Sequence, residues 1–105
     1  MYTFFVYRGD AVVIRRVVLS RLAEKQLRRM PRHVAAKLLE WVRAVKREGL
    51  ERVRVIHGFH DEPLRGARRG QRSIRLSRSY RAIYVVLDWG PSARARIEEV
   101  SKDEY

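Results

Sequence analysis

The feature that most constrains this chain is the run from Tyr80 to Asp88 (YRAIYVVLD), which is apolar on both faces of the strand that it predicts. Side chains of a strand alternate between the two faces of a sheet, so a strand without a polar face belongs in the middle. Flanking strands are predicted at Gln71 to Ser77 and, after a turn at Gly90 to Ser92, at Arg94 to Ser101. The second half of the chain therefore predicts a small, mainly antiparallel sheet.

The first part of the chain predicts a strand and then a helix. Ala11 to Leu19 (AVVIRRVVL) is rich in β-branched residues and favours a strand. The turn signal at Arg8 to Asp10 would allow Tyr2 to Tyr7 to form a hairpin arm in front of it. Ser20 is a good N-cap for a helix that runs to Met30.

A second helix is predicted from Arg32 to Glu48, because Pro31 ends the first helix and can open the next, and Gly49 suits the residue after a helix. Each helix has an apolar stripe at helical spacing, with Trp41 expected at the edge of the second. The stripes are Leu22, Ala23, Leu27 and Met30 in the first helix and Val34, Leu38, Val42 and Val45 in the second.

The segment between the helices and the sheet predicts a short extended piece at Val53 to Ile56 and then a loop from His57 to Gly70. No linker or repeat interrupts the chain, so residues 1–105 are expected to form one domain. The order of strand, two helices and three strands predicts an α+β fold, with the helical hairpin on one face of the sheet.

Composition narrows the function. Lysine and arginine number 24 against 12 acidic residues, a net charge of +12, and arginine dominates. A guanidinium group binds phosphate with two hydrogen bonds and stacks on bases, so nucleic acid is the expected partner. A solvated basic surface or an acidic protein partner would give the same charge.

Other functions are made improbable by what the sequence lacks. The absence of cysteine excludes a disulfide framework, a cysteine zinc site and a cysteine nucleophile. The chain starts without a signal-peptide pattern, and no apolar run approaches the ~20 residues of a membrane span. A cytoplasmic location and no membrane partner are therefore expected.

Seven arginines and no acid lie between Arg65 and Arg81. Alternation places Arg75 opposite Ile74 and Leu76, on the face that the helices would leave open, and Arg81 at the mouth of the buried strand. A charged sheet edge that prevents aggregation would also contain such a segment. The residues predicted to bind RNA are Arg65, Arg68, Arg69, Arg72, Arg78 and His60.

Two tyrosines of the central strand, Tyr80 and Tyr84, would add stacking faces to this surface. Arginines interleaved with aromatic rings on an open sheet suit single-stranded RNA, whose bases can lie on rings and guanidinium planes.

RNA can be cut when its 2′-OH attacks the adjacent phosphate, which requires a base, a cation for the phosphorane charge and an acid for the leaving oxygen. Glu62 could be the base, with Arg75 and Arg81 as the cations. The candidate proton donors are His60, Lys102 and Tyr105. A loop such as His60 to Pro63 is more often used for turn formation and capping than for catalysis.

A metal site is not expected, because His57, His60 and Asp61 supply too few ligands at useful spacing, and no cofactor is expected.

Several blocks, taken in order, resemble the RelE/HigB family of bacterial type II toxins. They are His60 to Gly66 (HDEPLRG), Gly70 to Leu76 (GQRSIRL), Tyr80 to Tyr84 (YRAIY), and Val100 to Lys102 (VSK) before Tyr105. Lys25 to Glu51 also resembles that family's helical hairpin, so the resemblance runs from about Ser20 to the end.

This resemblance implies a RelE-like toxin domain that acts as a ribosome-dependent mRNA endonuclease in the A site. Its partners would be mRNA, the ribosome with its 16S rRNA, and a cognate antitoxin with an acidic or amphipathic segment. By motif position, Arg81 resembles the arginine at the scissile phosphate and Arg75 a basic or histidine position on the neighbouring strand. Glu62 matches a carboxylate that is the base in some members, and Arg65 a substrate contact.

The end of the chain departs from the family pattern, Lys-His-x-Tyr, because Asp103 stands where histidine is usual. An aspartate, with an ordinary pKa near ~3.9, is a poor acid at neutral pH and repels phosphate. Three explanations are compatible with it: weak activity, an acid role moved to Tyr105 or Lys102, or a substitution that lets a toxic protein be produced. Two alternative functions follow, a non-catalytic gyrase inhibitor similar to ParE and a catalytically dead module that binds RNA or antitoxin.

Overall fold

The computed structural model describes residues 13–87 and 92–102, so the predicted hairpin arm at Tyr2 to Tyr7 lies outside the described residues. A five-stranded sheet has the strand order β2-β6-β5-β4-β3, in which β2 is parallel to β6 and the other neighbours are antiparallel. Its strands are β2 (Val17–Leu19), β3 (Glu62–Pro63), β4 (Arg72–Arg75), β5 (Tyr80–Leu87) and β6 (Arg94–Lys102). The strand that is apolar on both faces, β5, lies in the middle, as predicted.

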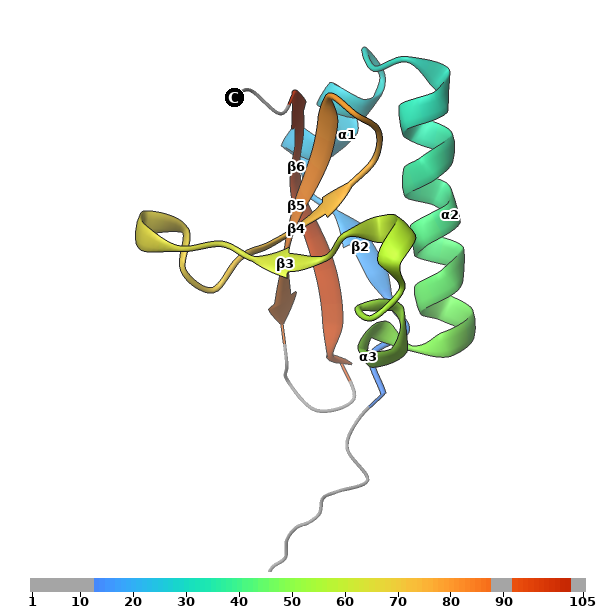
Figure 1. Cartoon of the computed structure of the whole chain (residues 1–105), viewed down its shortest axis with the longest axis vertical. Coiled ribbons are helices and arrows are strands. Elements are labelled where there is room, and N and C mark those ends of the chain that lie inside the picture. Colours follow the sequence, from blue (N-terminus) through green and yellow to red (C-terminus); the bar gives the residue numbers. More distant parts are fainter. Residues whose placement is uncertain (1–12, 88–91, 103–105) are drawn as a thin grey trace, which may run out of the picture.

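The helices cover one face of the sheet, as Figure 1 shows. They are α1 (Arg21–Leu27), α2 (Arg32–Glu48) and the short α3 (Leu50–Val53). The predicted N-cap is confirmed, because the Ser20 hydroxyl accepts a hydrogen bond from the Ala23 amide at 3.0 Å. The same hydroxyl donates to the Glu98 carbonyl at 2.7 Å and so ties α1 to β6. The predicted α+β fold is therefore confirmed.

The core lies between the helices and the sheet, and it corrects two details of the predicted stripes. Trp41 is fully buried in the core and not at its edge, and its ring lies 5.1 Å from that of Tyr84 on β5. Leu22, expected in the stripe of α1, is 52% exposed, whereas Ala23 is buried. Trp41 belongs to the same core cluster as the small residue Ala82 of β5.

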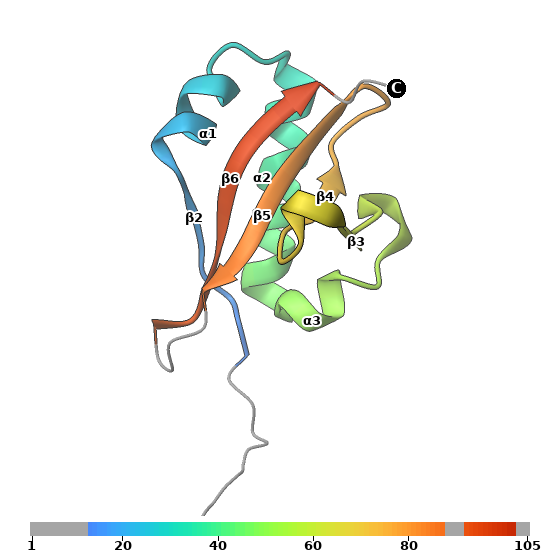
Figure 2. The same ribbon diagram turned by 90° about the vertical axis from the view of Figure 1, so that its left-hand side faces the viewer.

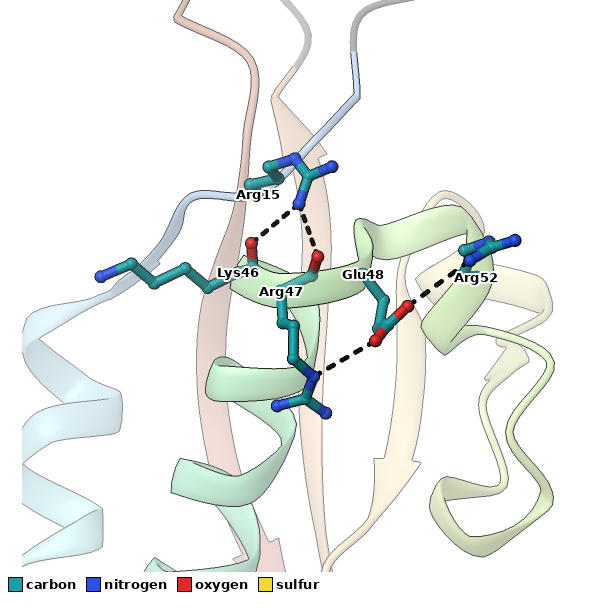
Figure 3. A network of polar contacts seen from close by, with 5 residues as sticks. All are labelled: Arg15, Lys46, Arg47, Glu48 and Arg52. Carbon is teal, nitrogen blue, oxygen red and sulfur yellow. Dashed lines mark hydrogen bonds and ion pairs between the residues drawn. The ribbon is translucent and has the colours of Figure 1, made fainter.

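The end of α2 is held by a segment from much earlier in the chain (Figure 3). Arg15 donates hydrogen bonds to the carbonyl oxygens of Lys46 at 3.0 Å and Arg47 at 2.7 Å. Helix ends leave such carbonyls without partners, and a guanidinium group satisfies them. Glu48 lies between Arg47 and Arg52, at 3.2 Å and 3.5 Å.

Strand β2 begins only at Val17, so the strand predicted over Ala11 to Leu19 is wrong for residues 13–16. The Ile14 carbonyl accepts a hydrogen bond from the Leu50 amide at 2.8 Å, so this part of the segment pairs with the start of α3.

The predicted extended piece at Val53 to Ile56 is also wrong. Gly49, at φ 89°, reverses the chain, and α3 begins at once because Leu50 and Val53, at helical spacing, are both buried.

Candidate functional site

The loop between the helices and the sheet folds across the face that the helices leave open. In Figure 1 the turn at residues 66–70 lies on the opposite side of the sheet from α2, and in Figure 2 it lies in front of β5. Arg68 in this turn lies 2.9 Å from Glu99 on β6. The side chain of Ile83, which alternates with core residues of β5 and so points to the open face, is fully buried there.

A small pocket of about 180 Å³ lies where this loop meets β4 and β5. Glu62 lies opposite Ser73, and Arg75 opposite Arg81, so all four side chains share the open face. Small-molecule sites usually measure roughly 300–1,000 Å³, so this pocket suits one group of a larger ligand, such as a backbone phosphate. The pocket is lined by His60, Glu62, Leu64, Ser73, Ile74, Arg75 and Arg81.

Two of the lining residues form an acid–base pair. The Nε2 atom of His60 lies 3.0 Å from the Oε2 atom of Glu62, and each side chain is more than half exposed. An imidazole at this distance can orient the carboxylate and exchange a proton with it. Like charges directly opposite on neighbouring strands are destabilising, so an anion between Arg75 and Arg81 would offset their repulsion. The pocket thus combines a possible base with two cations.

Between His60 and Glu62, the side chain of Asp61 turns the other way and is fully buried. Its Oδ1 atom accepts a hydrogen bond from Arg72 Nε at 2.7 Å, and its Oδ2 atom accepts one from the Tyr84 hydroxyl at 2.6 Å. Arg54 donates to the same hydroxyl at 3.4 Å. A buried carboxylate is stable when its oxygens are so paired, and this network joins the loop to β4, β5 and the end of α3.

The pKa values of the network agree with this arrangement. Burial, and then the hydrogen bond to Asp61, raise the pKa of Tyr84 well above its ordinary value. Burial acts to lower the pKa of Arg72, but the hydrogen bond and charge of Asp61 outweigh it, so the pKa is raised. The network therefore consists of a neutral hydroxyl and a charged guanidinium group at neutral pH.

The arginines between Arg65 and Arg81 differ in whether a carboxylate pairs with them, which the sequence does not reveal. Arg72, predicted to bind RNA, pairs with Asp61, and its side chain is 25% exposed. Arg68 is paired with Glu99 and also donates to Gln71 at 3.1 Å. The exposed residues that form no ion pair with another described residue are Arg65, Arg69 and Arg78.

The predicted stacking surface is wrong. Tyr84 is fully buried on the helix side, and Tyr80 packs partly buried against the same core. Strand alternation explains the error, because both tyrosines share the face of Ala82, whereas Arg81 lies on the other face.

The end of β6 brings Ser101 beside Arg81, because these residues are paired across the two strands. Lys102, one residue further, is exposed and does not line the pocket. Asp103 and Tyr105 lie outside the described residues, so their roles stay predictions.

Sequence reasoning missed the anchoring role of Asp61 and the pairing role of Glu99. For Glu99 the alternation of β6 offered a signal, since Glu99 points to the same face as Ser101.

Residues 13–87 and 92–102 contain no group of three potential metal ligands. Within these ranges, no helix has the length and apolar character that crossing a membrane requires.

Comparison with known proteins shows which class of protein shares this fold. No family model matches the sequence, and no curated protein matches it either. Solved structures of toxins do match over most of the chain, so the chain has the fold of RelE-like toxins, as the sequence blocks predicted.

Three of these structures give the extent of the likeness. A YoeB/ParE toxin from Agrobacterium tumefaciens has a TM-score of 0.65 at 20% identity, covering 86% of this chain and 99% of its own. The toxin–antitoxin complex RelBE2 from Mycobacterium tuberculosis gives 0.62 at 24% identity, covering 87% and 99%. YafQ from Escherichia coli BL21(DE3) gives 0.63 at 18% identity, covering 82% and 90%. At these identities the likeness shows the fold alone.

Proposed function

We propose that this protein is the toxin of a type II toxin–antitoxin system and that it cleaves mRNA in the ribosomal A site without a metal. The observation that carries the proposal is the pocket in which Glu62 and His60 face Arg75 and Arg81. The shared fold adds support, because solved structures with this fold are described as toxins and toxin–antitoxin complexes.

In the proposed reaction, Glu62 accepts the proton of the 2′-OH while His60, 3.0 Å away, orients its carboxylate. The 2′-oxygen bonds to phosphorus, and the bond from phosphorus to the 5′-oxygen breaks. Arg81 and Arg75 bind the phosphate oxygens and stabilise the charge that develops on them. The products are a 2′,3′-cyclic phosphate and a 5′-hydroxyl.

The leaving 5′-oxygen needs a proton, which the end of the chain would supply. Lys102 and Tyr105 are the candidates there, and Asp103 occupies the position that is histidine in the family pattern. His60 is the alternative donor, because it lines the same pocket. A slow parent enzyme is expected if Asp103 repels the phosphate.

The ribosome is proposed as the setting because a second basic surface lies on the helices. Five exposed cations there form no ion pair with another described residue, and phosphates of folded RNA are their natural partners. They are Arg21, Lys25, Arg28, Arg29 and Arg32. A cognate antitoxin with an acidic segment and a cytoplasmic location complete the proposal.

The test is cleavage of a defined mRNA on translating ribosomes by the parent chain and by Asp103→His. We expect slow cleavage by the parent and faster cleavage by the variant. Arg81→Ala should lower the rate by about 10²–10³-fold, the usual effect of one lost oxyanion donor. Arg43→Ala, which removes an exposed charge from α2, should have little effect and serves as the matched control.

Failure would take recognisable forms. If neither parent nor Asp103→His cuts mRNA, the endonuclease is ruled out. Salt-dependent RNA binding without product would then favour the catalytically dead module. Inhibition of gyrase supercoiling would favour the ParE-like alternative, which is kept because one structure with this fold is described as a YoeB/ParE toxin.

A further inference from the structure

The buried carboxylate of Asp61 is the observation with the greatest consequence outside the pocket. It lies between two residues of the proposed site, yet its side chain is fully buried and does not line the pocket. Its two oxygens are occupied by a guanidinium group from β4 and a hydroxyl group from β5. The three-residue sequence His60-Asp61-Glu62 therefore has two side chains on the pocket and one in the interior.

The backbone at this point adopts a conformation that needs support. His60 has φ 50°, and it is the non-glycine residue with positive φ among the described residues. This left-handed conformation is disfavoured for a residue with a side chain and persists where surrounding contacts determine it. Short bonds of 2.7 Å and 2.6 Å to Asp61, the next residue, are contacts of that kind.

Further contacts hold in place the anchor, which is the pairing of Asp61 with Arg72 and Tyr84. The Tyr84 hydroxyl that donates to Asp61 also accepts from Arg54, and the Tyr84 ring packs against Trp41 of α2. By contrast, Glu62 and His60 are each more than half exposed, and the short strand β3 has only two residues. The pocket-facing side chains thus have few restraints of their own.

We propose that Asp61 is a positioning residue that fixes the orientation of Glu62 and His60 toward the pocket through its bonds to Arg72 and Tyr84. This rests on the proposed function in so far as Glu62 and His60 are the catalytic pair. Arg72 and Tyr84 then act in the reaction through Asp61, and neither of them touches RNA. Misplacing a catalytic group by about 1 Å can lower a rate by about 10²-fold, so the anchor matters for turnover.

The test separates positioning from stability with two variants. Asp61→Ala removes the anchor and leaves a buried Tyr84 hydroxyl without its acceptor. Adding Tyr84→Phe removes that hydroxyl, so the double variant should regain stability while the anchor is still absent, since Arg72 can reach solvent. Glu48→Gln, a carboxylate between two arginines at the C-terminal end of α2 that contacts neither Asp61 nor Tyr84, is the control.

The first measurement uses no activity. Heteronuclear NOE values and chemical shifts of the His60 and Glu62 amides are recorded by NMR for all chains well below their unfolding temperatures. Both Asp61 variants should show lowered NOE values at these two amides, and Glu48→Gln should match the parent. Unchanged values at His60 and Glu62 in Asp61→Ala would overturn the proposal, whether or not the parent cuts RNA.

The second measurement is steady-state cleavage on ribosomes with the faster Asp103→His background. Asp61→Ala should lower kcat by about 10²-fold with little change in KM, and Asp61→Asn, which keeps the acceptor for Arg72, should fall in between. Tyr84→Phe added to Asp61→Ala should restore stability but not kcat. Recovery of kcat together with stability would show that Asp61 is merely structural and would overturn the proposal.

Discussion

The division of the arginine segment predicts how strongly RNA binding depends on salt. Each phosphate contact to single-stranded RNA contributes about −0.7 to the slope of log affinity against log salt concentration. Two of the seven arginines are held by carboxylates, and three exposed ones form no ion pair with another described residue. These three are Arg65, Arg69 and Arg78, and each is expected to make one phosphate contact.

Three such contacts contribute about −2.1 to the slope, which corresponds to a loss of about 18-fold in affinity between 50 and 200 mM salt. Fluorescence anisotropy with a short, unstructured, labelled RNA measures the slope. Arg69→Gln should reduce its magnitude by about 0.7.

The matched control is Arg68, which is next to Arg69 in the chain but is paired with Glu99. Arg68→Gln combined with Glu99→Gln removes an arginine together with its partner, so the net charge is unchanged and the slope should stay at the parent value. If this double variant and Arg69→Gln change the slope equally, the division of the arginines is wrong.

Three further predictions concern stability. Ser20→Ala removes the cap of α1 and should lower the free energy of unfolding in urea by about 1–2 kcal/mol. Gly49→Ala, at φ 89° and with its new Cβ 2.7 Å from a Val13 methyl, should lower it by more than about 1 kcal/mol, whereas Gly58→Ala, with open space, should not. Above about pH 10 the unfolded chain loses a tyrosine proton that folded Tyr84 retains. The free energy of unfolding should therefore fall with rising pH by up to about 1.4 kcal/mol per pH unit. In unfolding curves measured at alkaline pH, Tyr84→Phe should remove that fall.

Much of the fold could be predicted because it depends on local periodicity. The bounds of α2 and the central position of β5 follow from the spacing of apolar residues, and the N-cap at Ser20 follows from local chemistry. The wrong half of the first strand shows the limit of this reasoning. Its β-branched residues favour a strand, but the contact of Ile14 with Leu50 is decided by the position of a distant helix end.

The site could be predicted only in part, for a related reason. Alternation assigned Arg75 to the open face correctly, because that depends on its own strand. Whether an arginine binds a carboxylate or remains available for RNA depends on residues 11 or 31 positions away. Because the run from Tyr80 to Asp88 is apolar on both faces, its pattern does not show which face holds Tyr84. The burial of Tyr84 against Trp41 could therefore not be predicted.

The central claim is that RNA is cut by its own 2′-OH at the pocket of Glu62, His60, Arg75 and Arg81. The most direct test is mass analysis of the fragments released from A-site mRNA, with a second mRNA that carries a single 2′-deoxynucleotide before the scissile bond. The account predicts a 2′,3′-cyclic phosphate and a 5′-hydroxyl from the first mRNA and no cleavage at that bond in the second. Cleavage of the deoxy-substituted bond, or a fragment with a 3′-hydroxyl and a 5′-phosphate, would contradict it.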